Sequence, residues 1–216
     1  MDPFSSLDAV QFDLIGVVIA TIGILVLAAM ILYRSKKSIT SRSFFFFSFI
    51  TIFWGLSNYF LYKFTDPADI LLALRLHIFL TIWHAYSFFQ LAYVFPYESK
   101  ELPVWHRYAL LPLAFFSSTL LLIPFVFTQV SNLISVDEIA NPEKSQGIIL
   151  AGVVTFSFFI AGLSVLFRRI AQVKGDERRQ VILMFTGMSL TAGLLLLFSF
   201  ILPIGFKNFN FVPYGA

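Results

Sequence analysis

The residues of this chain that could do the most chemistry are polar side chains inside otherwise apolar stretches. The candidates for ligand binding fall in two neighbouring stretches and are Trp54, Asn58, Arg75, His77, His84, Tyr86 and Gln90. Guanidinium, imidazole, indole, phenol and amide groups all supply hydrogen-bond donors or acceptors. Because such groups cost free energy in apolar surroundings, their presence there indicates a site for a small ligand.

Asn58 and Arg75 are the leading pair of this candidate site. Only a short turn over 63–69 separates their two stretches, so two helices there are predicted to be antiparallel neighbours with this pair at similar depth. If Arg75 donates to the Asn58 carbonyl, it keeps donors for a carboxylate, a phosphate or another anionic group. Alternatively, Arg75 reaches the nearby interface and pairs with Asp66 or Asp69, which would hold the hairpin shut.

The histidines His77 and His84 lie about 10 Å apart along a helix axis, which is too far for both to bind one metal ion. The third histidine, His106, is predicted to lie in a cytoplasmic loop, so we expect neither haem nor any other cofactor. His77 and His84 are expected to be neutral and hydrogen-bonded, with a proton relay or pH switch as the alternative. Since both faces of the helix over 70–95 carry polar groups, this helix is expected to be central in the bundle.

Six apolar runs must position these residues, and they cover 12–33, 43–62, 70–95, 108–127, 147–167 and 181–205. Each has about 20 residues or more, which as a helix spans a hydrocarbon core roughly 30 Å thick. Barrel strands are excluded because the runs lack alternating polarity. With 58% hydrophobic and 12% charged residues, the chain is predicted to be an all-α, polytopic membrane bundle of six transmembrane helices forming one domain over 1–216.

Lys and Arg gather in the loops after 12–33, 70–95 and 147–167. This bias predicts that these loops are cytoplasmic, that the N-terminus is outside, and that the chain is a multi-pass protein of the inner (plasma) membrane. The same topology explains the net charge of +3, so we expect the lipid bilayer as a partner and no nucleic acid.

Catalytic and metal-binding motifs are absent from the sequence. It has no cysteine, no glycine-rich phosphate loop, no His-Glu-x-x-His and no Gly-x-Ser-x-Gly. We therefore expect no enzyme activity, no catalytic residues and no metal site in this segment. Glycines inside the predicted helices, such as Gly16, Gly23, Gly162, Gly187 and Gly193, are expected to let helices pack closely.

A set of weaker landmarks completes the pattern, namely Trp54, Asp66-Pro67, Arg75-Leu76, Phe95-Pro96, Arg178-Arg179-Gln180, Gly187, Leu202-Pro203, Pro213 and Gly215. From Asn58 onward their spacing resembles the N-terminal seven-transmembrane sensor region of bacterial histidine kinases. The resemblance implies a seventh helix and then a cytoplasmic kinase or other output module. This chain lacks both after Pro213, so it is either a fragment of a longer protein or a six-helix protein.

Two functions are compatible with these patterns. The first is a signal-receiving region that binds a small ligand from the outer side or from the bilayer and couples ligand binding to an output module outside this chain. Such a region is compatible with a homodimer. The second is a small transporter or channel, for which inverted repeats, broken helices or paired intramembrane carboxylates are typical. The sequence has no convincing repeat and no Asp or Glu in the middle of a predicted helix, which favours the receiver.

Overall fold

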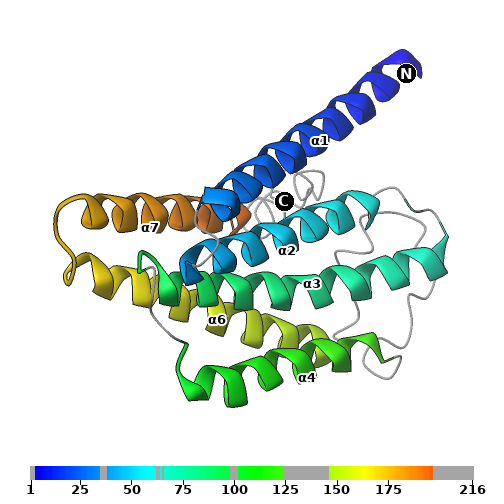
Figure 1. The fold of residues 1–216 in the computed structure, drawn as a ribbon. Coiled ribbons are helices and arrows are strands. Elements are labelled where there is room, and N and C mark those ends of the chain that lie inside the picture. Colours follow the sequence, from blue (N-terminus) through cyan, green and yellow to red (C-terminus); the bar gives the residue numbers. More distant parts are fainter. Residues whose placement is uncertain are drawn as a thin grey trace.

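The computed structural model describes residues 3–34, 38–61, 64, 66–97, 102–123 and 146–196, and this part of the chain is helical throughout apart from its turns (Figure 1). Its helices are α1 (Pro3–Arg34), α2 (Ile39–Leu61), α3 (Pro67–Val94), α4 (Leu111–Leu122), α6 (Gln146–Ile170) and α7 (Gly175–Leu196). One π-helical turn, η1 (His106–Leu110), leads directly into α4. The predicted all-α class is confirmed for the described residues.

Three of these helices are long and apolar enough to cross a membrane. The qualifying stretches lie in α2, α3 and α6 and are Ile39–Phe60, Ala68–Val94 and Ile149–Ile170. The apolar part of α1, Val18–Arg34, is shorter. The predicted helices over 108–127 and 181–205 extend past the described parts of α4 and α7. Six crossings therefore remain a prediction, whereas three helices have the length and composition for one.

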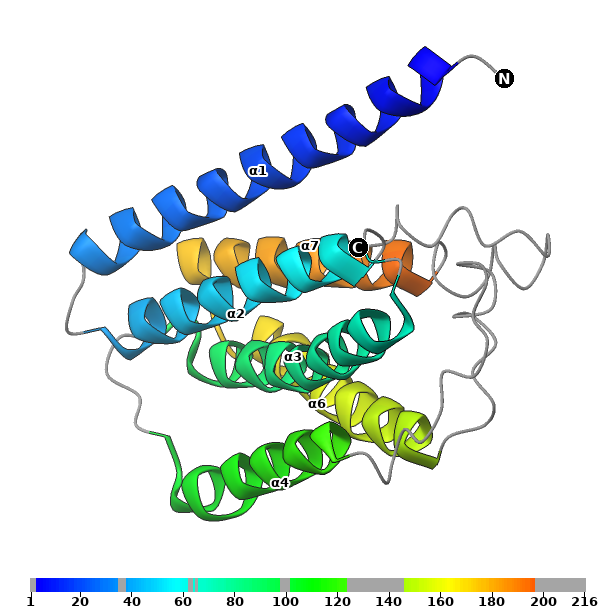
Figure 2. The same ribbon diagram turned by 90° about the vertical axis from the view of Figure 1, so that its right-hand side faces the viewer.

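Helix α3 lies at the centre of the bundle, where it contacts α2, α4 and α6 (Figures 1 and 2). Both views place α1 at one side, against α2, and α4 at the opposite side. Ile82 of α3 is fully buried in a cluster with Leu121 of α4 and Phe158 of α6. Phe88 is buried in a second cluster with Val181 of α7. The central position predicted for this helix is confirmed.

Helices α2 and α3 form an antiparallel pair, as predicted. At the start of α3, the Asp66 side chain accepts a hydrogen bond from the backbone N–H of Ala68 at 2.8 Å, and Pro67 takes the first helical position. This is a favourable helix start, because the acid satisfies a free N–H while proline has none to satisfy. Side-chain bonds then join α2 to α3 in antiparallel order along the pair, in which Ser43 contacts Gln90 and Ser57 contacts His77.

Gly162 allows α6 to pack closely on α3. A Cβ atom at this position would lie 2.6 Å from Cε1 of Phe88, a side chain that is itself 1% exposed. The expected packing role is therefore confirmed at Gly162. An added Cβ at Gly16, Gly23, Gly187 or Gly193 meets nothing within 4 Å among the described residues, so the close contacts expected there are not formed in this part of the structure.

The C-terminal end of α3 is bound by a side chain from α6. Arg169, which is 4% exposed, donates to the carbonyl oxygens of Ala92 at 3.1 Å and Tyr93 at 2.8 Å, and also to that of Phe95. Its guanidinium carbon lies 4.9 Å from the centre of the Tyr97 ring. Arg169 therefore satisfies carbonyl groups that a helix end leaves without partners.

A second helix holds the same end of α3. The Thr40 hydroxyl of α2 lies 3.5 Å from the carbonyl oxygen of Val94 and also donates to that of Tyr97. We call this arrangement around Thr40 and Arg169 the α3 clasp. It joins α2, α3 and α6 at the end of the bundle where the basic residues gather.

Candidate functional site

Four aromatic rings are stacked between α2 and α3 in the order Phe47, His84, Trp54 and His77, and we call this set the aromatic column. The His84 ring lies between the other two, with its centroid 5.1 Å from that of Phe47 and 5.1 Å from that of Trp54, each at an interplanar angle of 17°. The Trp54 and His77 centroids are 5.5 Å apart. The two helices thus contribute alternate rings to the column, in which Phe47, His84 and Trp54 are stacked and His77 is tilted by 30° against Trp54.

Hydrogen bonds fix the half of the column that contains Trp54 and His77. The indole Nε1 of Trp54 donates to the Thr81 hydroxyl at 2.9 Å, and that hydroxyl donates to the carbonyl oxygen of His77 at 2.8 Å. The Ser57 hydroxyl donates to the Trp54 carbonyl at 2.8 Å and lies 3.0 Å from Nδ1 of His77. Because a hydroxyl has a single hydrogen, this geometry favours the His77 tautomer in which Nδ1–H donates to Ser57.

His84 differs from His77 in its hydrogen bonding. Its Nε2 atom is buried and has no hydrogen-bond partner among the residues that the structure describes. Most buried polar atoms in proteins have a partner, and one that lacks it costs about 1–3 kcal/mol. The middle of the aromatic column therefore holds a buried imidazole nitrogen with no partner among the described residues, in a ring that is covered on both faces by Phe47 and Trp54.

Asn58 and Arg75 lie beside the His77 end of the column. Both side chains are half-buried, with Asn58 on α2 and Arg75 on α3. The Ser57–His77 contact fixes the local register, so Asn58, one residue after Ser57, and Arg75, two residues before His77, lie toward the same end of the bundle. A direct contact between the two side chains stays a prediction.

The other two predicted site residues lie away from the column. Tyr86 is 2% exposed and packs against Phe158 of α6 and His106 of η1, with ring centroids 5.6 Å and 5.3 Å away. The amide nitrogen of Gln90 lies 3.4 Å from the Ser43 hydroxyl, near the start of α2. The structure therefore brings Trp54, His77 and His84 together and places Tyr86 and Gln90 elsewhere.

His106 is a buried residue that sequence reasoning misplaced. It was predicted to lie in a cytoplasmic loop, but it lies in the π-helical turn η1 and is 3% exposed. Its ring is stacked on Phe89, with a centroid distance of 6.3 Å and an interplanar angle of 12°. Burial lowers the pKa of His106 below its ordinary value. The sequence signal for this position was the neighbouring Trp105, which packs against Tyr93 of α3.

No group of three or more His, Cys, Asp or Glu side chains that could hold a metal ion occurs within the described parts of the chain. What these parts do contain is a helical bundle with membrane-capable helices and a half-buried, polar aromatic column between two of them. By its fold and its site, the chain is therefore a multi-helix membrane region.

A family model gives the more particular assignment. The model described as the N-terminal 7TM region of histidine kinase matches residues 16–216, and the chain belongs to this family. The resemblance seen in the sequence landmarks is thereby confirmed. The family is a sensory region that is not catalytic by itself. Comparison with curated proteins and with solved structures gives no match.

Proposed function

We propose that this chain is a membrane-embedded signal receiver that binds a small ligand at the aromatic column and passes the resulting helix shift to a cytoplasmic output module. The observation that carries the proposal is the buried Nε2 of His84, which has no hydrogen-bond partner among the described residues and lies between the rings of Phe47 and Trp54. Membership of a sensory family supports it.

The chemistry of the column and its surroundings limits the ligand class. The aromatic and aliphatic side chains around the column favour an apolar group, and the His84 nitrogen adds one hydrogen bond. Arg75, near the His77 end, adds a charge that suits a carboxylate or phosphate. The ligand is therefore a small amphipathic anion that enters from the outer side or from the bilayer.

Coupling requires that the ligand bind two arrangements of the helices with different affinity. A ligand between α2 and α3 changes how these two helices pack, and α3 also contacts α4 and α6. We propose that the chain lies in the inner (plasma) membrane, with its basic loops in the cytoplasm and its N-terminus outside. A shift of α3 then reaches the cytoplasmic end of the bundle.

The proposal is tested with Trp54 as a fluorescent reporter. The chain has three tryptophans, so Trp83→Phe and Trp105→Phe leave Trp54 as the single emitter. We expect members of a panel of short- and medium-chain carboxylates and alkyl phosphates to change its emission and to raise the melting temperature in detergent. His84→Phe is expected to abolish both responses, whereas Leu72→Ala, on an exposed part of α3, is expected to keep them.

Arg75→Leu separates ligand binding from a purely structural role of the guanidinium. If Arg75 binds the ligand, the variant folds and loses the response; if it only holds the hairpin shut, the variant loses folded protein as well. Compound flux into liposomes that contain the purified chain, with no change in Trp54 emission, would contradict the receiver and favour the transporter.

A further inference from the structure

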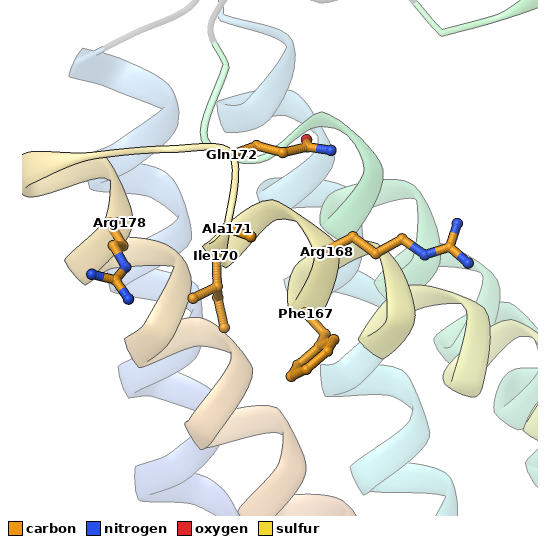
Figure 3. A pocket seen from close by; sticks show the side chains of 6 residues that line it. All are labelled: Phe167, Arg168, Ile170, Ala171, Gln172 and Arg178. Atoms are coloured by element: carbon orange, nitrogen blue, oxygen red, sulfur yellow. The ribbon is translucent and has the colours of Figure 1, made fainter.

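A shallow pocket of about 500 Å³ lies where α6 ends and α7 begins (Figure 3). Its lining is mainly apolar, and the guanidinium groups of Arg168 and Arg178 point apart on opposite sides of Phe167 and Ile170. In a site for a small ligand, a few polar groups converge on the bound molecule. The arginines of this pocket do not converge in that way, whereas the polar groups of the aromatic column contact one another.

Trp54 has a special place in the aromatic column, because its indole lies between the rings of His84 and His77. The indole centroid is 5.1 Å from the centroid of His84 and 5.5 Å from that of His77. Phe47 covers the other face of His84 at the same distance of 5.1 Å. Since Nε2 of His84 is itself buried, a ligand reaches this nitrogen only after a neighbouring side chain has moved.

The two rings that cover His84 differ in their surroundings. Phe47 also packs against Phe88, at a centroid distance of 6.3 Å, and Phe88 is 1% exposed in the second core cluster. Displacement of Phe47 would leave a cavity in this core, which is costly. Trp54 is half-buried at the surface of α2. The indole is therefore the covering ring that moves more easily.

The hydroxyl of Thr81 holds the indole in place. It accepts a hydrogen bond from Nε1 of Trp54 at 2.9 Å and donates one to the carbonyl oxygen of His77 at 2.8 Å. Because a hydroxyl has a single hydrogen, its bond to the backbone leaves the oxygen lone pairs as the acceptor for the indole. The Thr81 hydroxyl thus fixes both the position and the orientation of the ring that covers His84.

We propose that Trp54 is the gate of the aromatic column and that Thr81 is the positioning residue that keeps this gate closed. The inference rests on the receiver function proposed above, to which it adds the step that admits the ligand. When the bond between Trp54 and Thr81 breaks, the indole leaves the stack and one face of His84 becomes accessible. Since the ligand binds only the open arrangement, the strength of this bond lowers the apparent affinity.

Diethyl pyrocarbonate tests the gate without any ligand, because it adds a carbethoxy group to an accessible imidazole nitrogen. The purified full chain is treated in detergent, and mass spectrometry of its peptides gives the reaction rate of each histidine. Thr81→Val keeps the shape of the side chain and removes the bond to Trp54. We expect His84 to react about fivefold faster in this variant, the factor that corresponds to one hydrogen bond of about 1 kcal/mol.

Three controls separate opening of the gate from a general loosening of the bundle. His106 is an internal control, because its Nε2 is also buried and has no partner among the described residues; its rate is expected to stay unchanged. Thr119→Val removes a hydroxyl that donates to the carbonyl oxygen of Phe115, four residues earlier, at 2.7 Å, and is expected to keep the wild-type rate at His84. Thr81→Ser retains the hydroxyl and is expected to keep that rate as well.

Two results would overturn the gate. The first is a folded Thr81→Val variant in which His84 reacts at the wild-type rate. The second is an equal rise at His84 and His106, which would show that the whole bundle has loosened. If Thr81→Val melts below the wild type, the Trp54→Phe variant decides, because it has no indole N–H. Its His84 also reacts faster, and Thr81→Val then adds no further increase; a further increase contradicts the gate.

The gate and the receiver function are tested separately, because the reagent measures access to His84 in the absence of a ligand. Faster reaction in Thr81→Val together with no response of Trp54 emission to any carboxylate or phosphate supports the gate and contradicts the receiver. The wild-type rate in Thr81→Val together with a ligand response contradicts the gate alone.

Discussion

Replacement of Arg169 by methionine tests the α3 clasp directly. Methionine keeps most of the apolar length of the side chain but removes every donor. The carbonyl groups of Ala92, Tyr93 and Phe95 then lose their bonds to a charged group in a buried place. A hydrogen bond to a charged group contributes about 1.5–3 kcal/mol. Since the three bonds share one guanidinium and are not additive, we expect a loss of about 3–5 kcal/mol in the free energy of unfolding.

The assay is thermal or dodecyl-sulfate unfolding of the purified chain in mixed micelles, followed by circular dichroism. For a chain of this size, the expected loss lowers the melting temperature by about 10 °C. Arg168→Met is the matched control, because Arg168 is the adjacent residue and is exposed; its effect is expected to stay within about 0.5 kcal/mol. Arg169→Lys keeps the charge but not the planar fork, so it should fall between the two. Equal effects of Arg169→Met and Arg168→Met would refute the clasp.

Two further substitutions test packing and burial. Gly162→Ala places a Cβ 2.6 Å from the Phe88 ring, and this overpacking is expected to cost about 1–3 kcal/mol in the same unfolding assay; Gly152→Ala in the same helix meets open space and is expected to leave stability unchanged or raise it. For His106, burial lowers the pKa in the folded state, so the unfolded chain binds the proton more tightly and stability falls as the pH drops below about 6.5. Between pH 7 and pH 5, the melting temperature of His106→Phe should fall less than that of the wild type. An equal fall would show that His106 does not contribute to the pH dependence of stability.

The helices themselves follow from the sequence because a bilayer leaves backbone groups no partner outside their own segment. The runs over 43–62, 70–95 and 147–167 became α2, α3 and α6 for this reason. Helix boundaries were less accurate. Helix α7 begins at Gly175 instead of residue 181 because Asp176 and Glu177 favour a helix start, although they interrupt the apolar run.

The candidate site was predicted only in part. The spacing of His77 and His84 places them on one helix face, and the structure confirms this. Phe47 has no polar group that would mark it as a site residue in the sequence, yet it packs against His84 and Phe88. Stacking between two helices depends on their exact register, which the length of the connecting turn does not determine.

Arg169 shows a second limit of sequence reasoning. A basic residue at the end of a membrane helix is normally a signal of topology, and Arg168 and Arg169 look identical in that respect. Only the packing of α6 against α3 distinguishes the exposed arginine from the buried one.

The position of the α3 clasp also determines how α3 can swing. With 28 residues, α3 is about 42 Å long, so a tilt of about 5° around its clasped end displaces the opposite end by roughly 4 Å. Because Thr40 and Arg169 bind the clasped end, any displacement there would move α2 and α6 together with α3. A displacement that reaches the clasped end of α3 would therefore be passed to two neighbouring helices at once.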